Sequence, residues 1–153
     1  MPARSRSQRD PWELEDDTPP PWRATIETRA AAIHQPLTSE ARWSLFALQS
    51  LLADLRSIPE YSFIRTIVLY GPLANGVAHD PLSLMAVLYE TTPASVHATI
   101  WEQLGERFKV VERTFALRVD CLITTEGELS NSATQPPHYA TIEHDYVVVW
   151  PME

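Results

Sequence analysis

The residues of this 153-residue chain that could do chemistry lie in three short segments, each beside or within an apolar run. Gly71-Pro72 follows the run 64–70, where a tight turn could hold phosphate groups through main-chain N–H groups. Asp80-Pro81-Leu82-Ser83 opens a second run, and Asp120 lies within a third. Aspartates often hold Mg²⁺ against phosphates. The three segments therefore contain residue types that a phosphate and metal site would use.

The elements that must position these segments begin with a helix from Thr38 or Ser39, both good N-cap residues. A stripe of apolar residues recurs along it at helical spacing and consists of Leu45, Leu48, Leu52 and Leu55. Pro59 ends this helix, and a weaker helix is predicted before it over residues 24–34. The leucine stripe predicts a helix that packs on a core.

Apolar, β-branched runs predict four strands, and they favour the fold class α/β (α+β), a mixed sheet of about four strands flanked by helices. The strands are expected at residues 64–70, 83–89, 115–124 and 146–150. Thr92-Pro93 opens a predicted helix that runs to about Phe108, and Pro136-Pro137 opens another that runs to about His144.

In the third predicted strand, alternation places Val119, Cys121 and Ile123 on one face and Asp120 with Leu122 on the other. Cys121 is the only cysteine, so neither an internal disulfide nor a cysteine zinc site is possible, and we interpret it as a small core residue. Trp43 and Trp101 are predicted to lie in the core or an interface rather than to stack on a ligand.

The composition predicts that the chain divides into two parts. They are a disordered, Pro-rich, charged tail over residues 1–23 and one domain over residues 24–153. Trp12 and Trp22 are unusual in such a tail. One interpretation is that they fold back onto the domain. The other is that they anchor a protein partner, since tryptophan is enriched at binding hot spots.

The order of these segments resembles the core of a minimal nucleotidyltransferase of the DNA polymerase beta superfamily. The family pattern is a strand ending in Gly-Ser, a short helix, a strand bearing Asp-x-Asp and a later strand with a third Asp. Leu69-Tyr70-Gly71 matches the first strand end, residues 84–88 match the apolar run after Asp-x-Asp, and residues 119–123 match the strand with the third Asp. The resemblance covers about 80 residues and implies a nucleotidyltransferase-like fold with a Mg²⁺-nucleotide site.

The departures from that pattern fall on the residues that carry the chemistry. Pro72 replaces the serine and supplies neither an N–H nor a hydroxyl to a phosphate. Pro81 and Ser83 replace the two aspartates, so Asp120 is the remaining acidic residue of the pattern and the metal ligand, if any. Gly71 and Pro72 are the remnant of the nucleotide-binding turn. The resemblance therefore predicts a degenerate site without a confident catalytic residue.

Composition limits the partners of the chain. Asp and Glu outnumber Lys and Arg, 20 to 12, for a formal net charge of −8, which disfavours non-specific binding to nucleic acid. We find no apolar run long enough for a transmembrane helix and no signal-peptide core, so a cytoplasmic location without a membrane partner is expected.

Three functional hypotheses remain open. The first is a pseudoenzyme without a cofactor that acts through protein contacts as an antitoxin-like or regulatory subunit. The resemblance implies a HEPN-type helical protein as its partner in a toxin–antitoxin module. The second is an active Mg²⁺-dependent enzyme that transfers NMP from an NTP through a rebuilt site of Asp80, Asp120 and Glu90. The third is a scaffold subunit of a larger assembly, or of a homo-oligomer, with no ligand.

Overall fold

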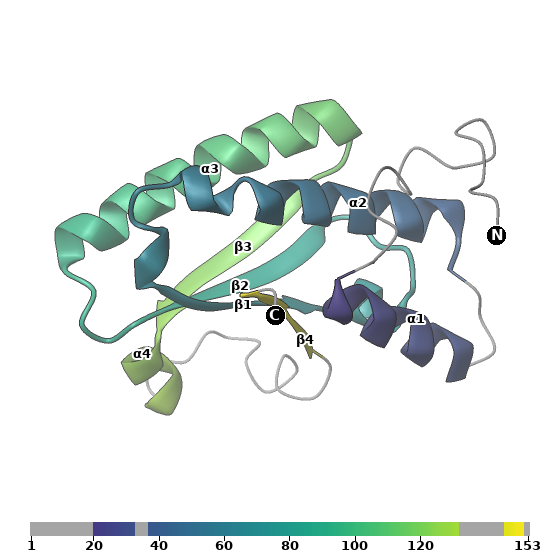
Figure 1. Ribbon diagram of the computed structural model, residues 1–153, viewed down its shortest axis with the longest axis horizontal. Helices are drawn as coiled ribbons and strands as arrows, with labels where there is room; N and C mark the ends of the chain where they lie inside the picture. The colour runs from purple at the N-terminus through teal and green to yellow at the C-terminus, as the bar shows by residue number, and fades with distance from the viewer. Residues whose placement is uncertain (1–19, 33–36, 132–145, 152–153) are drawn as a thin grey trace, which may run out of the picture.

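The computed structural model describes residues 20–32, 37–131 and 146–151 (Figure 1). The α-helices are α1 (Pro21–Ala32), α2 (Ser39–Ala53), α3 (Ala94–Phe115) and α4 (Glu126–Ser130). The strands are β1 (Ile64–Tyr70), β2 (Leu82–Leu88), β3 (Val119–Thr125) and β4 (Tyr146–Trp150). Three 3₁₀ turns complete the set: η3 (Leu55–Ser57), η4 (Tyr61–Phe63) and η5 (Pro72–Asn75).

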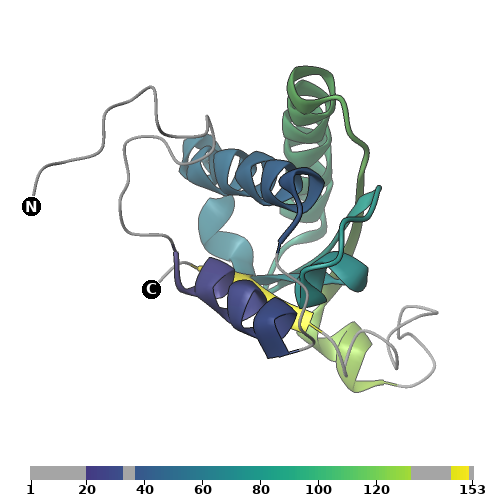
Figure 2. The same cartoon turned by 90° about the vertical axis from the view of Figure 1, so that its right-hand side faces the viewer.

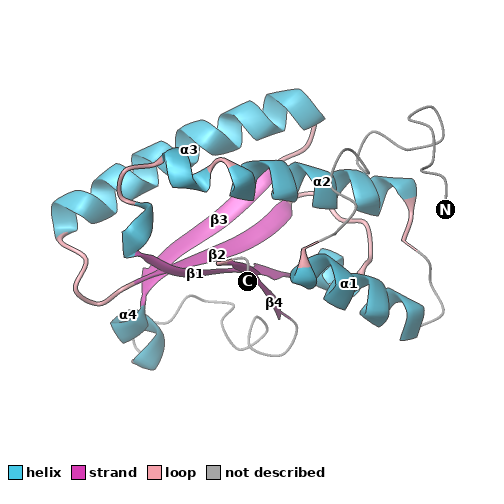
Figure 3. Cartoon of the chain, viewed as in Figure 1, coloured by secondary structure: helices cyan, strands magenta, loops and turns pink. Residues whose placement is uncertain are grey.

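The four strands form one mixed sheet in the order β3-β2-β1-β4 (Figure 3). β1 pairs antiparallel with both β2 and β4, whereas β2 and β3 are parallel and are joined through α3. A parallel connection of this kind needs a crossover, and the 22-residue α3 supplies it. The prediction of a mixed α/β sheet of about four strands flanked by helices is confirmed.

Most of the core lies between the sheet and helices α2 and α3, which cover one of its faces (Figures 1 and 3). α2 begins as predicted, with the Thr38 hydroxyl accepting a hydrogen bond from the N–H of Ala41. Its leucines Leu45, Leu48 and Leu52 are buried, and Leu55 continues the buried stripe in η3. The helical spacing of these leucines therefore identified the covered face correctly.

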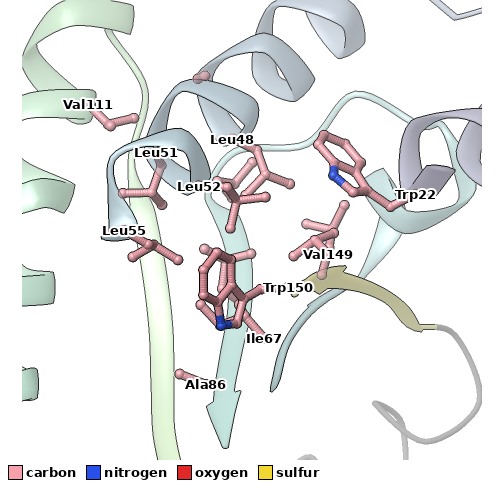
Figure 4. Close-up of a cluster of buried hydrophobic side chains, with 14 of the residues drawn as sticks. Trp22, Leu48, Leu51, Leu52, Leu55, Ile67, Ala86, Val111, Val149 and Trp150 are labelled. Carbon is pink, nitrogen blue, oxygen red and sulfur yellow. The ribbon is translucent and has the colours of Figure 1, made fainter. Parts of the chain in front are cut away.

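α1 begins at Pro21, inside the stretch predicted to be tail, and it corrects the predicted role of Trp22. Trp22 is only 3% exposed and belongs to the main core, so it is not a free anchor for a partner. Figure 4 shows its indole beside the core side chains of β4 and α2, including Val149 and Leu48. α1 lies along β4 (Figure 2), and Arg29 donates a hydrogen bond to the carbonyl of Tyr146 at 3.1 Å. Folding back onto the domain is the interpretation that the structure supports for Trp22.

α3 is longer than predicted, because it continues to Phe115 instead of stopping near Phe108. Val111 and Phe115 extend its buried stripe of Ile100 and Leu104 at helical spacing, and this packing outweighs the β-branched character of the segment. Ala116 then ends the helix in the left-handed region at φ 54°, so β3 starts at Val119.

Two tryptophans on the helices behave differently from each other. Trp43 is partly buried, stacks edge-on against Phe115 and donates its indole N–H to the carbonyl of that residue at 2.9 Å. Trp101 is 58% exposed on α3, so of the two predicted positions it does not take the core one, and the interface position stays a prediction. The predicted helix over 136–144 and Trp12 lie outside the described residues. Within the described ranges, no helix combines the length and apolar composition needed to cross a bilayer.

Candidate functional site

The turn after β1 is built on Gly71, as the sequence predicts. Gly71 has φ 83° and ψ −169°, a conformation that other residues adopt only with strain, and it leads into η5. The carbonyl of Gly71 accepts from the N–H of Ala74 at 3.1 Å, and that of Pro72 accepts from Val77 at 3.1 Å. Pro72 is the first residue of η5, where its ring fits but where it offers no N–H to a ligand. The turn lies where the sequence predicts it, and Pro72 provides no N–H at the position where the resemblance implies a phosphate donor.

Ser83 and Asp120 lie side by side at the start of the parallel strands. They are register partners between β2 and β3, and both point to the face opposite α2 and α3. A Cβ atom added to Gly71 would lie 3.9 Å from the Cβ and Oγ atoms of Ser83, so the turn abuts this pair. Ser83 is 9% exposed, whereas Asp120 is exposed to solvent. The structure thus brings together three segments that are separated in the sequence by up to 49 positions.

Tyr70 belongs to the same site, although sequence reasoning did not select it. It is the last residue of β1 and packs on a small apolar cluster of Val68, Met85 and Val87, which lies on the face opposite α2 and α3. Burial, then the charges of Asp120 and Cys121, raise the pKa of the Tyr70 hydroxyl above 10.0. Its position in the sequence, directly before Gly71, is the signal that could have identified it. Tyr70 is therefore neutral at physiological pH and lies within electrostatic reach of the Asp120 carboxylate.

Asp80 does not stand in for the missing carboxylates. Its carboxylate accepts a hydrogen bond from the N–H of Arg118 at 3.0 Å and lies 3.5 Å from the guanidinium Nε of the same residue. The Asp80-Pro81 peptide bond is cis, and the Pro81 carbonyl lies 3.1 Å from Nδ1 of His79 and 3.5 Å from Oγ of Ser83. Asp80 is thus bound to the residue that precedes β3.

Glu90 lies at the other end of the sheet from Asp120. Its carboxylate accepts from the N–H of Gly127 at 2.6 Å, at the end where β3 leads into α4. β2 has seven residues, and at about 3.3 Å per residue it separates Asp80 from Glu90 by roughly 20 Å or more. The hypothesis of a rebuilt site that uses Asp80, Asp120 and Glu90 together is therefore wrong for Glu90.

The donor set fits a two-metal site poorly. Across the described ranges, no three His, Cys, Asp or Glu side chains gather closely enough to hold a metal ion. Asp120 offers one exposed carboxylate, and its register partner Ser83 offers a neutral hydroxyl that is a weak ligand. Asp120 is therefore the described residue of this site that could contact a Mg²⁺-nucleotide, and it would do so as a single ligand.

Cys121 points away from this site to the helix-covered face, where it packs on the main core. The residue is partly exposed as a whole, but burial of the thiol raises its pKa from 9.0 to about 12. A main-chain hydrogen bond from Ala86 lowers the pKa and the Asp120 charge raises it, each by less than burial does. The thiol is therefore protonated at neutral pH, and the interpretation of Cys121 as a core residue is confirmed.

Comparison with known proteins adds little to this geometry. No protein-family model matches the chain, and no curated protein sequence matches it. A crystal structure of a candidate nucleotidyltransferase from Sulfolobus solfataricus matches 74% of this chain and 88% of its own. Its TM-score is 0.40 and its sequence identity is 15%. A likeness at that level does not establish the activity of this chain.

Proposed function

We propose that this chain is a nucleotidyltransferase-like domain that has lost catalysis and acts through protein–protein contacts as an antitoxin-like or regulatory subunit. The observation that carries the proposal is the pairing of Ser83 with Asp120 on adjacent strands. At that place the family pattern needs a second carboxylate. The frame around the pair is preserved, because the Gly71 turn abuts Ser83 and the strands keep the expected order.

The number of charged metal ligands limits how much catalysis the site could support. Paired metal ions stabilise the attacking and leaving oxygens of phosphoryl transfer by several kcal/mol, and about 1.4 kcal/mol corresponds to tenfold in rate. Pro81 and Ser83 provide no charge, and Asp80 is bound to Arg118. We therefore expect a rate many orders of magnitude below that of a competent enzyme.

The choice of a protein partner rests on the resemblance and on charge. Minimal nucleotidyltransferases of this kind pair with HEPN-type helical proteins in toxin–antitoxin modules. A formal charge of −8 favours a protein surface over nucleic acid as the partner. The HEPN-type partner remains part of the proposal.

The first test measures catalysis directly. The purified full chain is incubated with Mg²⁺, each labelled NTP and a host lysate, with Asp120→Asn as the matched control. The proposal predicts the same background label for both proteins. Label on a protein or small molecule that disappears with Asp120→Asn would instead establish the active alternative, in which NMP is transferred through a rebuilt site.

The second test measures ligand binding without catalysis. A ligand that binds the native state raises the melting temperature by mass action. We expect millimolar NTP with Mg²⁺ to leave the melting temperature of the chain unchanged. A rise that Asp120→Asn removes would contradict a site without a nucleotide, and it would support the active enzyme.

A further inference from the structure

A cavity of about 290 Å³ lies where the start of α2, the end of α3 and the loop before β2 meet. The start of α2 and the end of α3 lie toward the same end of the molecule (Figure 1). Ligand pockets usually measure about 300–1,000 Å³, so this cavity suits a small molecule or a single side chain. Its charged and aromatic lining consists of Glu40, Trp43, His79, Asp80 and Phe115.

The aromatic wall of the cavity is fixed by contacts within the chain. The indole N–H of Trp43 donates to the carbonyl of Phe115 at 2.9 Å, and the two rings meet edge-on with centroids 5.1 Å apart. Phe46 packs against both rings, with centroids at 6.2 Å and 5.6 Å. A wall that is already ordered loses little conformational freedom when a ligand binds. Trp43 is only partly buried by this packing, and it also lines the cavity.

The charges around the cavity sum to a negative value. Glu40 and Asp80 are both exposed carboxylates, and the lining includes no Lys or Arg. α3 ends at Phe115, where a helix carries a negative partial charge of about half an elementary charge, and the start of α2 carries the opposite partial charge. Arg118 lies outside the lining, 3.5 Å from Asp80, and is 70% exposed, so solvent screens its charge.

The polar atoms of the lining are mainly hydrogen-bond acceptors. Within the described ranges, no hydrogen bond or ion pair joins the Glu40 carboxylate to another residue. The Asp80 carboxylate has about four lone-pair positions, and its contacts with Arg118 use two of them. Because the Pro81 carbonyl can only accept, its 3.1 Å contact with Nδ1 of His79 leaves Nε2 as an acceptor in the neutral ring. A ligand for this cavity must therefore be a cation with several donors.

We propose that the cavity binds a guanidinium group, carried by a small molecule or by an arginine side chain. A guanidinium has a positive charge, several N–H donors and no acceptor. It is also planar, so it stacks on an indole such as that of Trp43 while its N–H groups donate to carboxylates. An ammonium group carries the same charge without the plane. Stacking on a ligand adds to the core or interface position that the sequence predicts for Trp43.

A titration of the full chain with n-butylguanidinium, followed by NMR of the main-chain amides and indole N–H groups, measures this binding. We expect saturable shifts at Ala78, Ala116 and the indole of Trp43, with a Kd of roughly 1 mM or tighter. n-Butylurea has the same planar shape without the charge and should bind at least about tenfold more weakly, since it loses the attraction to both carboxylates. Equal affinity for the two compounds, or saturable shifts confined to another part of the chain, would overturn the proposal.

Glu40→Gln and Glu102→Gln remove the same charge from two places. Glu102 is exposed on α3 outside the lining, so it is a matched control for Glu40. Glu40→Gln should weaken the binding of n-butylguanidinium about threefold to fivefold, the size expected for an exposed ion pair, and Glu102→Gln should leave it unchanged. The NMR spectra also show that both variants are folded. Equal effects of the two substitutions would contradict a site at the cavity.

The source of the guanidinium group can be tested on the chain itself. Arg4, Arg6 and Arg9 precede the described residues and carry this group. The full chain with all three changed to Gln should bind n-butylguanidinium more tightly if these arginines occupy the cavity, and with unchanged affinity if the group comes from outside the chain. Absence of saturable binding both by this variant and by the unchanged chain would overturn the proposal. These outcomes are independent of whether the chain binds nucleotide or catalyses its transfer.

Discussion

The two faces of the sheet have different physical characters. The face under α2 and α3 presents closely packed aliphatic residues such as Leu69, Leu84 and Ala86, all at most 1% exposed. The opposite face has a small apolar cluster of Val68, Met85 and Val87. Beside that cluster it carries the polar residues of the candidate site. The same strands thus provide stability on one side and a chemically distinct surface on the other.

This difference separates the residues that hold the fold from the residues of the candidate site. The residues that fix the strand register are on the helix-covered face, and none of them is a candidate ligand. Ser83 and Asp120 are on the opposite face, where a change of side chain leaves the main packing intact. Substitutions that remove function and those that remove stability should therefore separate by face.

Trp22→Ala should give the largest loss of stability, because it empties a site on the helix-covered side. Truncation of a buried tryptophan costs about 3–5 kcal/mol. Trp22→Phe should cost much less, since it keeps most of the ring and removes an indole N–H that has no partner in the described part of the chain. The measurement is urea denaturation followed by circular dichroism. Equal losses of unfolding free energy for Trp22→Ala and Trp22→Phe would show that packing of the Trp22 ring is not what α1 contributes to stability.

Leu84→Ala and Leu122→Ala compare the two faces directly with one chemical change. Leu84 is 1% exposed on β2 toward the helices, and Leu122 is partly exposed on β3 toward the opposite face. The first should cost about 2–5 kcal/mol and the second clearly less, because a partly exposed side chain leaves a smaller cavity. Chemical denaturation gives both values. A larger loss for Leu122→Ala would reverse the assignment of the faces.

Much of this two-faced sheet could be predicted from the sequence, because period-two alternation and β-branched runs are local signals. β1 matches its predicted bounds at both ends, and the Gly71 turn is where the sequence placed it. The C-terminal turns of α3 extend beyond the predicted end because Val110 and Val111 are typical of strands. Packing of the buried Val111 and Phe115 holds the segment helical, whereas Val110 is 56% exposed. Trp22 falls in the predicted tail because its core neighbours come from α2 and from β4, and β4 is more than 120 residues away in the chain.

The residues of the candidate site could be predicted from the sequence, but which acidic residues lie close to them could not. Gly71, Ser83 and Asp120 follow from the family pattern, but which acidic residues approach them depends on strand register and on loop contacts. Asp80 is one residue from Pro81 in sequence, yet Arg118 holds it. Tyr70 has no motif of its own, and it becomes relevant because burial and the Asp120 charge act on its hydroxyl.

The free energy of unfolding should depend on pH through the thiol of Cys121, which packs on the helix-covered face. Its pKa is about 12 in the folded chain and 9.0 when solvated, so between these values the unfolded chain loses a proton that the folded chain keeps. The free energy of unfolding therefore falls as pH rises from 9 to 12, by about 1 kcal/mol per pH unit. Cys121→Ala should remove this slope in urea titrations at each pH. An unchanged slope in the variant would assign the dependence to other groups.

Asp120→Asn should give the smallest effect on stability and the clearest effect on the opposite face. The exposed carboxylate contributes little to packing, so the free energy of unfolding should change by less than about 0.5 kcal/mol. The pKa of Tyr70 should fall, because one of the two charges that raise it is gone, yet it should stay above 10.0 because burial is the larger cause. NMR titration of the tyrosine ring carbons measures the Tyr70 pKa in the unchanged chain and in Asp120→Asn. A Tyr70 pKa that does not respond would separate the tyrosine from the Asp120 carboxylate and remove it from the site.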